Sequence, residues 1–378
     1  MQDRISFDLY GVQHNLAAGD IVCCIDHGGT GGDGVIGPFV PSSNRVEVSH
    51  REKFGAEVPP AQVLDGLIDK SHLNPTRVIY GVAAAVKKNY SRASDNMRFD
   101  VDGNKLRRGL PSNTRLRLRN DYGLVTERLA QPVDRRQTFV LQQGQRFGRI
   151  NVITAAGAGS GLGTGRLLLL EGGGHHVDEI EGSHGRLVVR CNPKAAINQL
   201  ELLPWWQEHF GPSPANSDRI LCAGGLLKLL NFVVETGGYT LPTDLERLVK
   251  GEMSDTNAHQ ARLLLTQHAM ASSTDDDVCA ATIVLFMDLF GGFLQNAAFL
   301  HGPKEDNYRI YLLGGVLTGW LKEEQFWPRF GKYLLRSFCS TVEPVDERWL
   351  ASVPIDIVKE HRLFALHGAT IAAACLAA

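Results

Sequence analysis

The stretch that decides the fold is AAGAGSGLGTGRLLLLEGGGHHVD, residues 155–178, in which two glycine-rich segments enclose a short apolar run. The first segment, Gly157–Gly163, follows the apolar run Ile150–Thr154, which predicts a buried strand that enters a turn. A turn this rich in glycine lets backbone N–H groups converge on an anion. The second segment, Glu171–Asp178, puts a carboxylate and two imidazoles on a loop. Phosphate-binding backbone beside hydroxyl-binding side chains indicates phosphoryl transfer to a polyol.

Glycine-rich turns are also common in plain β-hairpins, so this interpretation needs support from elsewhere in the chain. The standard nucleotide fingerprints do not provide it. Leu162 or Thr164 stands where G-x-G-x-x-G needs its last glycine, and no G-x-x-x-x-G-K-[ST] occurs. Support comes from Ile21–Val40, where a strand ends in Asp26-His-Gly-Gly-Thr30 and a second strand follows. Two such units predict a duplicated domain whose glycine turns face each other across a cleft.

Length and composition bound the class of protein. With 378 residues, 43% hydrophobic and 21% charged, the chain has the length for two cores and the composition of a soluble globular protein. We expect a small domain over residues 1–120, completed by a helix near 361–378, and a large domain over 121–360. The seven cysteines lack metal-ligand spacing, and no apolar leader is present. The apolar stretch Ala281–Leu300 contains Asp288, so it predicts a core helix and not a membrane span. These features predict a cytoplasmic protein with no membrane partner.

A basic segment raises nucleic acid as a partner. Residues 87–149 hold 15 Lys and Arg against 6 Asp and Glu, although the whole chain carries only −2. The charges are scattered, few aromatic residues lie between them, and no helix-turn-helix or RNA-binding motif occurs. We therefore expect a solvated basic face and no nucleic-acid partner.

Within this segment the alternating stretch Thr114–Arg119 predicts a strand that runs into Asn120-Asp121, just before a helix that begins near Tyr122. Open α/β sheets bind ligands at the carboxyl ends of their strands, so the pair is well located for chemistry. An Asn or Asp before a helix is also a common N-cap, and the two roles can fall on different residues.

Taken in order, the motifs resemble those of the bacterial-type glucokinases, within the actin-like, hexokinase-like ATPase superfamily. The resemblance implies an α/β, two-domain actin-like ATPase fold of the ribonuclease H-like kind, with the active site in a cleft between the domains. It also implies transfer of the γ-phosphoryl group of ATP, with Mg²⁺, to the 6-hydroxyl of glucose or another hexose. A homodimer is compatible with the sequence, which does not fix the oligomeric state.

The resemblance assigns roles residue by residue. Asp121 matches the general base of the family's N-D pair. Asp26 would orient the waters of Mg²⁺. The sugar-binding residues would be Asn96, Asn120, Asp121, Glu171, His175 or His176, and Asp218. The phosphate- and nucleotide-binding residues would be Asp26, Gly28, Gly29 and Thr30; Gly157, Gly159, Ser160, Gly161 and Gly163; Gly224 and Gly225; and Gly314 and Gly315.

Three departures from the family pattern concern affinity. The Arg that usually follows the first phosphate motif is missing from Gly31–Gly34, the segment Glu171–His176 is one residue longer than the family's E-G-G-H sugar clamp, and Asp218 stands where the family has Glu. Two alternatives therefore stay open: a kinase for another hexose or an aminosugar, and a catalytically weak sugar-binding relative. The phosphoryl donor could be ATP, ADP or polyphosphate.

Overall fold

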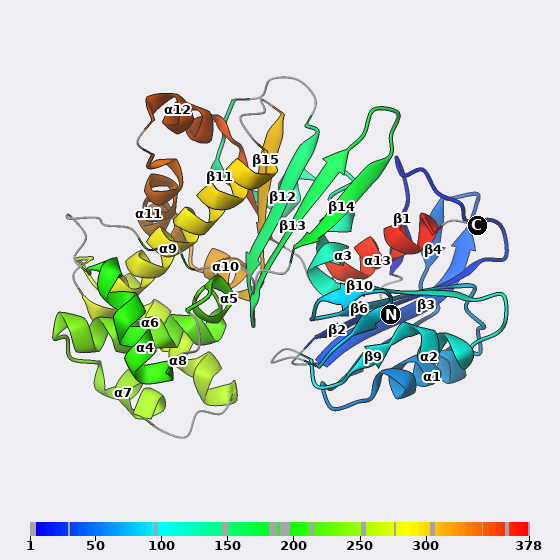
Figure 1. Ribbon diagram of the computed structural model, residues 1–378, viewed down its shortest axis with the longest axis horizontal. Coiled ribbons are helices and arrows are strands. Elements are labelled where there is room, and N and C mark those ends of the chain that lie inside the picture. Colours follow the sequence, from blue (N-terminus) through cyan, green and yellow to red (C-terminus); the bar gives the residue numbers. More distant parts are fainter. Residues whose placement is uncertain are drawn as a thin grey trace.

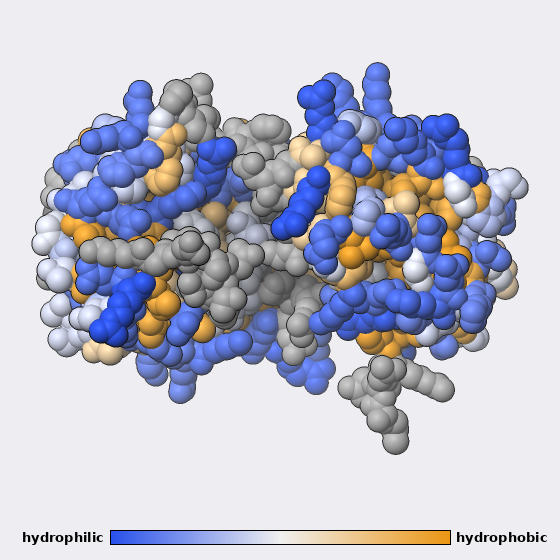
Figure 2. Space-filling view, turned by 90° about the horizontal axis from the view of Figure 1, so that it is seen from below, coloured by the Kyte–Doolittle hydropathy of each residue, from blue (hydrophilic) through white to orange (hydrophobic). Residues whose placement is uncertain are grey.

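The computed structural model describes residues 5–28, 31–93, 97–145, 150–180, 187, 189, 197–211, 215–250, 255–275, 277–302, 307–341, 343–359 and 363–376. Two α/β halves lie side by side, each built around one large sheet (Figure 1). Seen from below, hydrophilic residues and smaller apolar patches are mixed over the described surface of both halves (Figure 2).

The N-terminal sheet begins the chain. Its strand order is β1 (Ser6–Asp8), β4 (Arg45–Glu47), β3 (Gly31–Val40), β2 (Ile21–Gly28), β6 (Arg77–Val82) and β10 (Arg115–Asn120), and β5 (His50–Phe54) pairs with β3. Strands β2 and β3 form an antiparallel hairpin, whereas β6 lies parallel to both β2 and β10. Small additions are β7 (Val86–Lys87), β8 (Tyr90–Ser91), β9 (Val101–Asp102) and α2 (Gly103–Arg108).

Helices cover both faces of this sheet because successive residues of its buried strands point to opposite sides. Cys23 and Ile25 pack under α1 (Pro60–Ser71), and Val22 and Cys24 pack with α13 (Phe364–Ala374). Helix α13 also lies against α3 (Asp121–Arg128). The C-terminal helix thus packs against β2 and β6 of the N-terminal sheet.

The C-terminal sheet repeats this arrangement. Its order is β11 (Thr138–Gln142), β16 (Ile355–Val358), β15 (Tyr308–Leu313), β12 (Val152–Ala158), β13 (Leu162–Leu169) and β14 (His175–Ile180). Here β12 and β13 form the antiparallel hairpin, and β15 and β16 continue it in parallel. A hairpin followed by two parallel strands thus occurs in both sheets, and each hairpin contains one of the two glycine-rich units.

The remaining helices belong to the second half, around α9 (Val278–His301), which packs against α6 (Ala223–Gly237), α8 (Asp255–Ala271) and α11 (Phe326–Cys339). By length and composition α9 could cross a membrane, but 89% of its most apolar stretch is buried inside the protein, as expected for the predicted core helix. The others are η1 (Arg135–Gln137), η3 (Gln199–Glu201), α4 (Leu202–Phe210), α5 (Ser217–Ile220), α7 (Thr243–Lys250), α10 (Gly315–Gly319), η4 (Trp320–Lys322) and α12 (Pro344–Ser352).

Two local predictions are wrong. The sequence predicts a helix near Asn198–Phe210 that Pro204 interrupts. Pro204 does not interrupt it, because it lies in the first turn of α4, where no N–H is needed for an intrahelical bond. The sequence also predicts a short strand that starts at Asp218. This segment instead belongs to α5, which is capped by Asn216, whose side chain accepts a hydrogen bond from the Arg219 N–H.

Candidate functional site

The pair Asn120-Asp121 joins β10 to α3, and the two residues have different tasks. The Asn120 side chain accepts hydrogen bonds from the N–H groups of Tyr122 (3.0 Å) and Gly123 (3.1 Å) and donates to the Ala84 carbonyl (3.2 Å). Asn120 is therefore the N-cap of α3. Asp121 is the first residue of the helix, is half-buried, and accepts a hydrogen bond from the Tyr122 N–H (2.7 Å). The cap fixes the backbone that carries the Asp121 carboxylate.

Tyr122 brings this helix against the hairpin of β12 and β13. A Cβ atom on Gly163 would lie 1.9 Å from Tyr122 Cδ2, and one on Gly157 would lie 2.4 Å from Tyr122 Oη. These two glycines thus allow close packing of α3, which is a structural reason for glycine at both positions. The Tyr122 hydroxyl is buried and has no hydrogen-bond partner among the described residues. Burial, with the nearby Asp121 charge, raises the Tyr122 pKa well above its ordinary value.

The turn between β12 and β13 meets two other glycine segments. Exposed Ser160 lies at its tip, and the Gly159 N–H donates to the Gly161 carbonyl (2.8 Å). The Gly159 carbonyl accepts from the Ala223 N–H at the start of α6 (2.8 Å), and a Cβ on Gly159 would lie 4.0 Å from the Gly315 N. Three of the predicted nucleotide-binding segments are therefore brought together by the fold.

Some glycines of this cluster have open space and others are packed against backbone. A Cβ on Gly224 or Gly315 would meet nothing within 4 Å, and on Gly159 nothing closer than 3.8 Å. By contrast, a Cβ on Gly225 would lie 2.1 Å from the Ile220 carbonyl oxygen, and Gly314, at φ +96°, would meet the Ala158 carbonyl oxygen at 2.4 Å. The open positions leave backbone accessible to a ligand, whereas the packed positions are needed for the fold.

Asp218 lies at this same cluster. Its Oδ1 accepts a hydrogen bond of 2.7 Å from the Leu162 N–H, just beyond the glycine turn. One carboxylate oxygen is thus engaged with the hairpin backbone, next to the segment predicted for phosphate.

The first glycine motif contributes Asp26, in β2, opposite Asp33 in β3. Burial, and second the charge of Asp33, raises the Asp26 pKa to about 6. Gly28 ends β2 and pairs with Gly31. No three His, Cys, Asp or Glu side chains among the described residues form a metal-binding group. A single carboxylate is compatible with Mg²⁺ that is held mainly by phosphate oxygens and water. Gly29, Thr30 and Asn96, also predicted here, lie outside the described residues.

The predicted sugar clamp lies on the hairpin of β13 and β14. A Cβ on Gly123 would lie 2.6 Å from Glu179 Cγ, so the start of α3 lies beside Glu179. His175 precedes Glu179 by four residues along β14, so its backbone lies roughly 13 Å from that of Glu179 at the rise of a strand. Exposed Glu171 lies farther still, in the turn at the opposite end of the hairpin from Gly159. The fold therefore places Glu171 away from the start of α3 and sets His175 against Glu127 of that helix. That Glu171, His175 and His176 share one sugar site with Asp121 stays a prediction.

A chain of charges connects the two sheets. Arg119 on β10 forms ion pairs with Glu127 (3.3 Å) and with Glu179 on β14. His175 Nε2 lies 2.5 Å from the other Glu127 oxygen. Glu179 also accepts a hydrogen bond from the Asn120 N–H (3.4 Å). Burial lowers the Arg119 pKa, but the two carboxylates outweigh it and the net shift is upward. This Arg119 cluster (Arg119, Glu127, His175 and Glu179) joins the sheets next to Asp121.

Comparison with known proteins identifies the family. A glucokinase family model matches residues 53–375. The chain belongs to the glucokinase family. No curated protein matches the sequence. Among solved structures, glucokinase from an Antarctic psychrotroph is similar at a TM-score of 0.68 and 18% identity, covering 94% of this chain and 98% of that one.

Two further glucokinase structures were determined with ligands. Glucokinase from Balamuthia mandrillaris in complex with glucose is similar at a TM-score of 0.67 and 15% identity, covering 94% of this chain and 93% of that one. A ROK family glucokinase from Streptomyces griseus in complex with glucose and AMPPNP is similar at a TM-score of 0.54 and 15% identity. The match covers 93% of this chain and 98% of that one. Likeness at such identity shows the fold, and it confirms the two-domain actin-like ATPase fold for this glucokinase family member.

The family motif points to residues that our sequence interpretation missed. Glu181-Gly-Ser-His184 follows β14 directly and has the spacing of E-G-G-H without the extra residue of Glu171–His176. It lies outside the described residues. The spacing of Glu and His is the signal that identifies this segment, but Glu171–His176 upstream has the same residue types and more glycine.

Proposed function

We propose that this glucokinase family member transfers the γ-phosphoryl group of ATP to the 6-hydroxyl of glucose. The proposal depends on one observation above all: three glycine segments converge beside the helix that Asp121 begins. The glucose and AMPPNP in the titles of two similar structures support a sugar and a nucleotide as the ligand classes.

In this proposal the glycine cluster holds the nucleotide. Backbone near Gly159, Gly224 and Gly315 is free of steric obstruction. The N-terminus of α6, a helix of 15 residues, adds a favourable dipole for an anion. Phosphoryl transfer needs mostly positioning and charge stabilisation. When bound, Mg²⁺ would supply charge neutralisation, and Asp26 would hold its waters.

Asp121 would act as general base and accept the proton of the attacking hydroxyl. Its carboxylate is half-buried and is carried by a backbone that Asn120 fixes. General-base catalysis is worth ~10²–10⁴-fold in rate. The other hydroxyls would be held by Asn96, Glu181 and His184, whose roles follow from motif spacing, and by Oδ2 of Asp218.

A hexose panel with ATP, read by coupled ADP release, tests the reaction. Glucose should give the highest kcat/KM. Glu181→Gln tests the sugar site, with Glu171→Gln as its matched control. We expect Glu181→Gln to raise KM for glucose ~10-fold or more, because a hydrogen bond to a charged group is lost, and Glu171→Gln to leave it unchanged. The opposite pattern would assign sugar binding to Glu171 and its neighbours. No turnover with any sugar would favour a sugar-binding protein.

Asp218 favours a second candidate, a kinase for another hexose or an aminosugar. An Asp carboxylate reaches one methylene less than Glu, and one of its oxygens is already bonded to the Leu162 N–H. Contact to the sugar would then be weaker than in relatives with Glu. In the same panel, a higher kcat/KM for mannose or glucosamine than for glucose would establish this candidate.

A further inference from the structure

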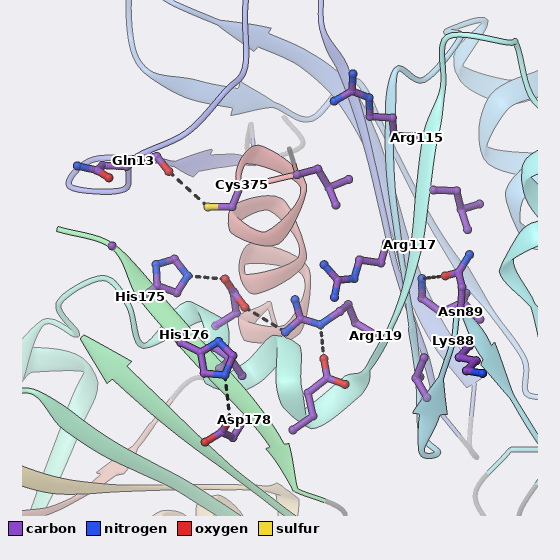
Figure 3. Close-up of a pocket in the computed structure, with 18 of the residues that line it drawn as sticks. Gln13, Lys88, Asn89, Arg115, Arg117, Arg119, His175, His176, Asp178 and Cys375 are labelled. Carbon is purple, nitrogen blue, oxygen red and sulfur yellow. Dashed lines mark hydrogen bonds and ion pairs between the residues drawn. The ribbon is translucent and has the colours of Figure 1, made fainter. Parts of the chain in front are cut away.

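A pocket of about 880 Å³ lies between the free edges of the two sheets. One wall is β10, residues 115–119, and the other is β14, residues 175–179. Gln13, Asn89 and Cys375 contribute to its rim (Figure 3). None of the glycines of the nucleotide cluster lines it, so this pocket is separate from that cluster. Its size is that of a site for a small metabolite.

The β10 wall is cationic. Arg115, Arg117 and Arg119 alternate along the strand, so their side chains lie on one face about 6–7 Å apart. Figure 3 shows Arg117 and Arg119 directed into the space between β10 and His175. Arg119 is held by its two carboxylates, but Arg117 and Lys88 have no ion-pair or hydrogen-bond partner among the described side chains.

The acidic groups of the pocket already have partners of their own. Both oxygens of Glu127 are engaged, by His175 and Arg119, and Glu179 is paired with Arg119. Asp178 is paired with Arg166, outside the pocket, and its other oxygen contacts His176 at 2.9 Å. An entering anion would therefore meet Arg117 and Lys88 without displacing a carboxylate from them.

We propose that this pocket binds a small phosphorylated compound, with Arg117 as the principal contact to the phosphate group. A guanidinium matches two oxygens of a phosphate at once, and neighbouring cations on one strand face can share the dianion. A phosphate fills only a small part of the volume. The Gln13 amide donates to the Gly172 carbonyl and His176 contacts Asp178 through Nε2, so each has a second polar atom that can bond to a hydroxylated body. A sugar phosphate therefore suits the pocket better than the free ion.

Isothermal titration of the full chain with inorganic phosphate and with glucose 6-phosphate, at constant ionic strength, tests the proposal without depending on catalysis. Arg117→Glu should weaken binding of both probes ~10-fold or more, as expected when a charged hydrogen bond is lost. Arg348→Glu, an exposed charge reversal on α12, is the matched control and should bind like the wild type. Tighter binding of the ester than of phosphate would identify a sugar phosphate site, and equal binding a site for phosphate itself.

Hydrogen exchange then locates the bound probe. Amides of residues 115–119 and 173–179 should gain protection when the probe binds, and Arg117→Glu should abolish this protection. If Arg117→Glu folds poorly, Lys88→Glu gives the same test. Unchanged affinity in both variants, or protection confined to residues 157–163 and 222–225, would overturn the proposal and assign the anion to the nucleotide cluster.

Discussion

Replacing Arg119 by methionine should destabilise the folded protein by about 3 kcal/mol. The side chains of Arg119, Glu127 and Glu179 are only 13%, 6% and 23% exposed, so the substitution leaves two carboxylates in a poorly solvated place. Removing one partner of a buried ion pair costs ~3–5 kcal/mol, and the partial exposure of Glu179 puts the value at the lower end. Glu179 would still accept a hydrogen bond from the Asn120 N–H.

Urea denaturation of the apo protein, followed by tryptophan fluorescence, measures the effect. Arg136→Met is the control, because Arg136 is 90% exposed and its pair with Asp134 should contribute ~0–1 kcal/mol. The double variant Arg119→Met with Glu127→Gln should recover part of the loss, because one uncompensated charge is removed. A loss below about 1 kcal/mol for Arg119→Met, or strictly additive effects in the double variant, would refute the view that the Arg119 cluster is a buried, coupled unit.

Three further predictions concern the glycine hairpin and the first motif. Tyr122→Phe removes a buried hydroxyl that has no hydrogen-bond partner in the described part of the chain, so stability should be unchanged or ~1 kcal/mol higher in urea denaturation; a clear loss would mean that the hydroxyl is bonded. Gly163→Ala should cost ~1–3 kcal/mol of stability by collision with Tyr122, whereas Gly159→Ala should keep stability and weaken AMPPNP binding in calorimetry; the reverse pattern would contradict the division into packed and open glycines. The Asp26 pKa of about 6 lies above its ordinary value of 3.8, so the folded state favours the protonated carboxyl. Stability of the apo protein should be highest below about pH 4 for this group and be lost as the pH rises through 6, and Asp26→Asn should flatten that change; an equal pH dependence in both proteins would exclude Asp26 as its source.

The sequence predicted well those parts of the fold that local patterns determine. The sequence pattern predicts a helix over Pro60–Ser71 and a strand over Tyr308–Leu313, and α1 and β15 have these bounds. Proline at a helix start and a short apolar run before a glycine pair are local signals. The same holds for Asn120, whose cap and neighbouring carboxylate were both anticipated.

The location of Glu171–His176 could not be predicted in the same way. A hairpin turn and a ligand loop both favour glycine, and Gly172 and Gly173 have φ values of +94° and +93°, as a turn requires. Only the pairing of β13 with β14 decides which end of the hairpin these residues occupy, and that register is a long-range property. The glycines of the cluster show the same limit, because their neighbours come from distant segments.

The most direct test of the proposed function is the turnover of Asp121→Asn with ATP, Mg²⁺ and the best sugar of the panel. The substitution is nearly isosteric, and Asn120 still caps α3, so the folded structure and AMPPNP affinity should be retained. We predict a kcat at least ~10²-fold lower, the lower limit for loss of a general base. A kcat within a few-fold of the wild type would contradict the assignment of Asp121 as the base.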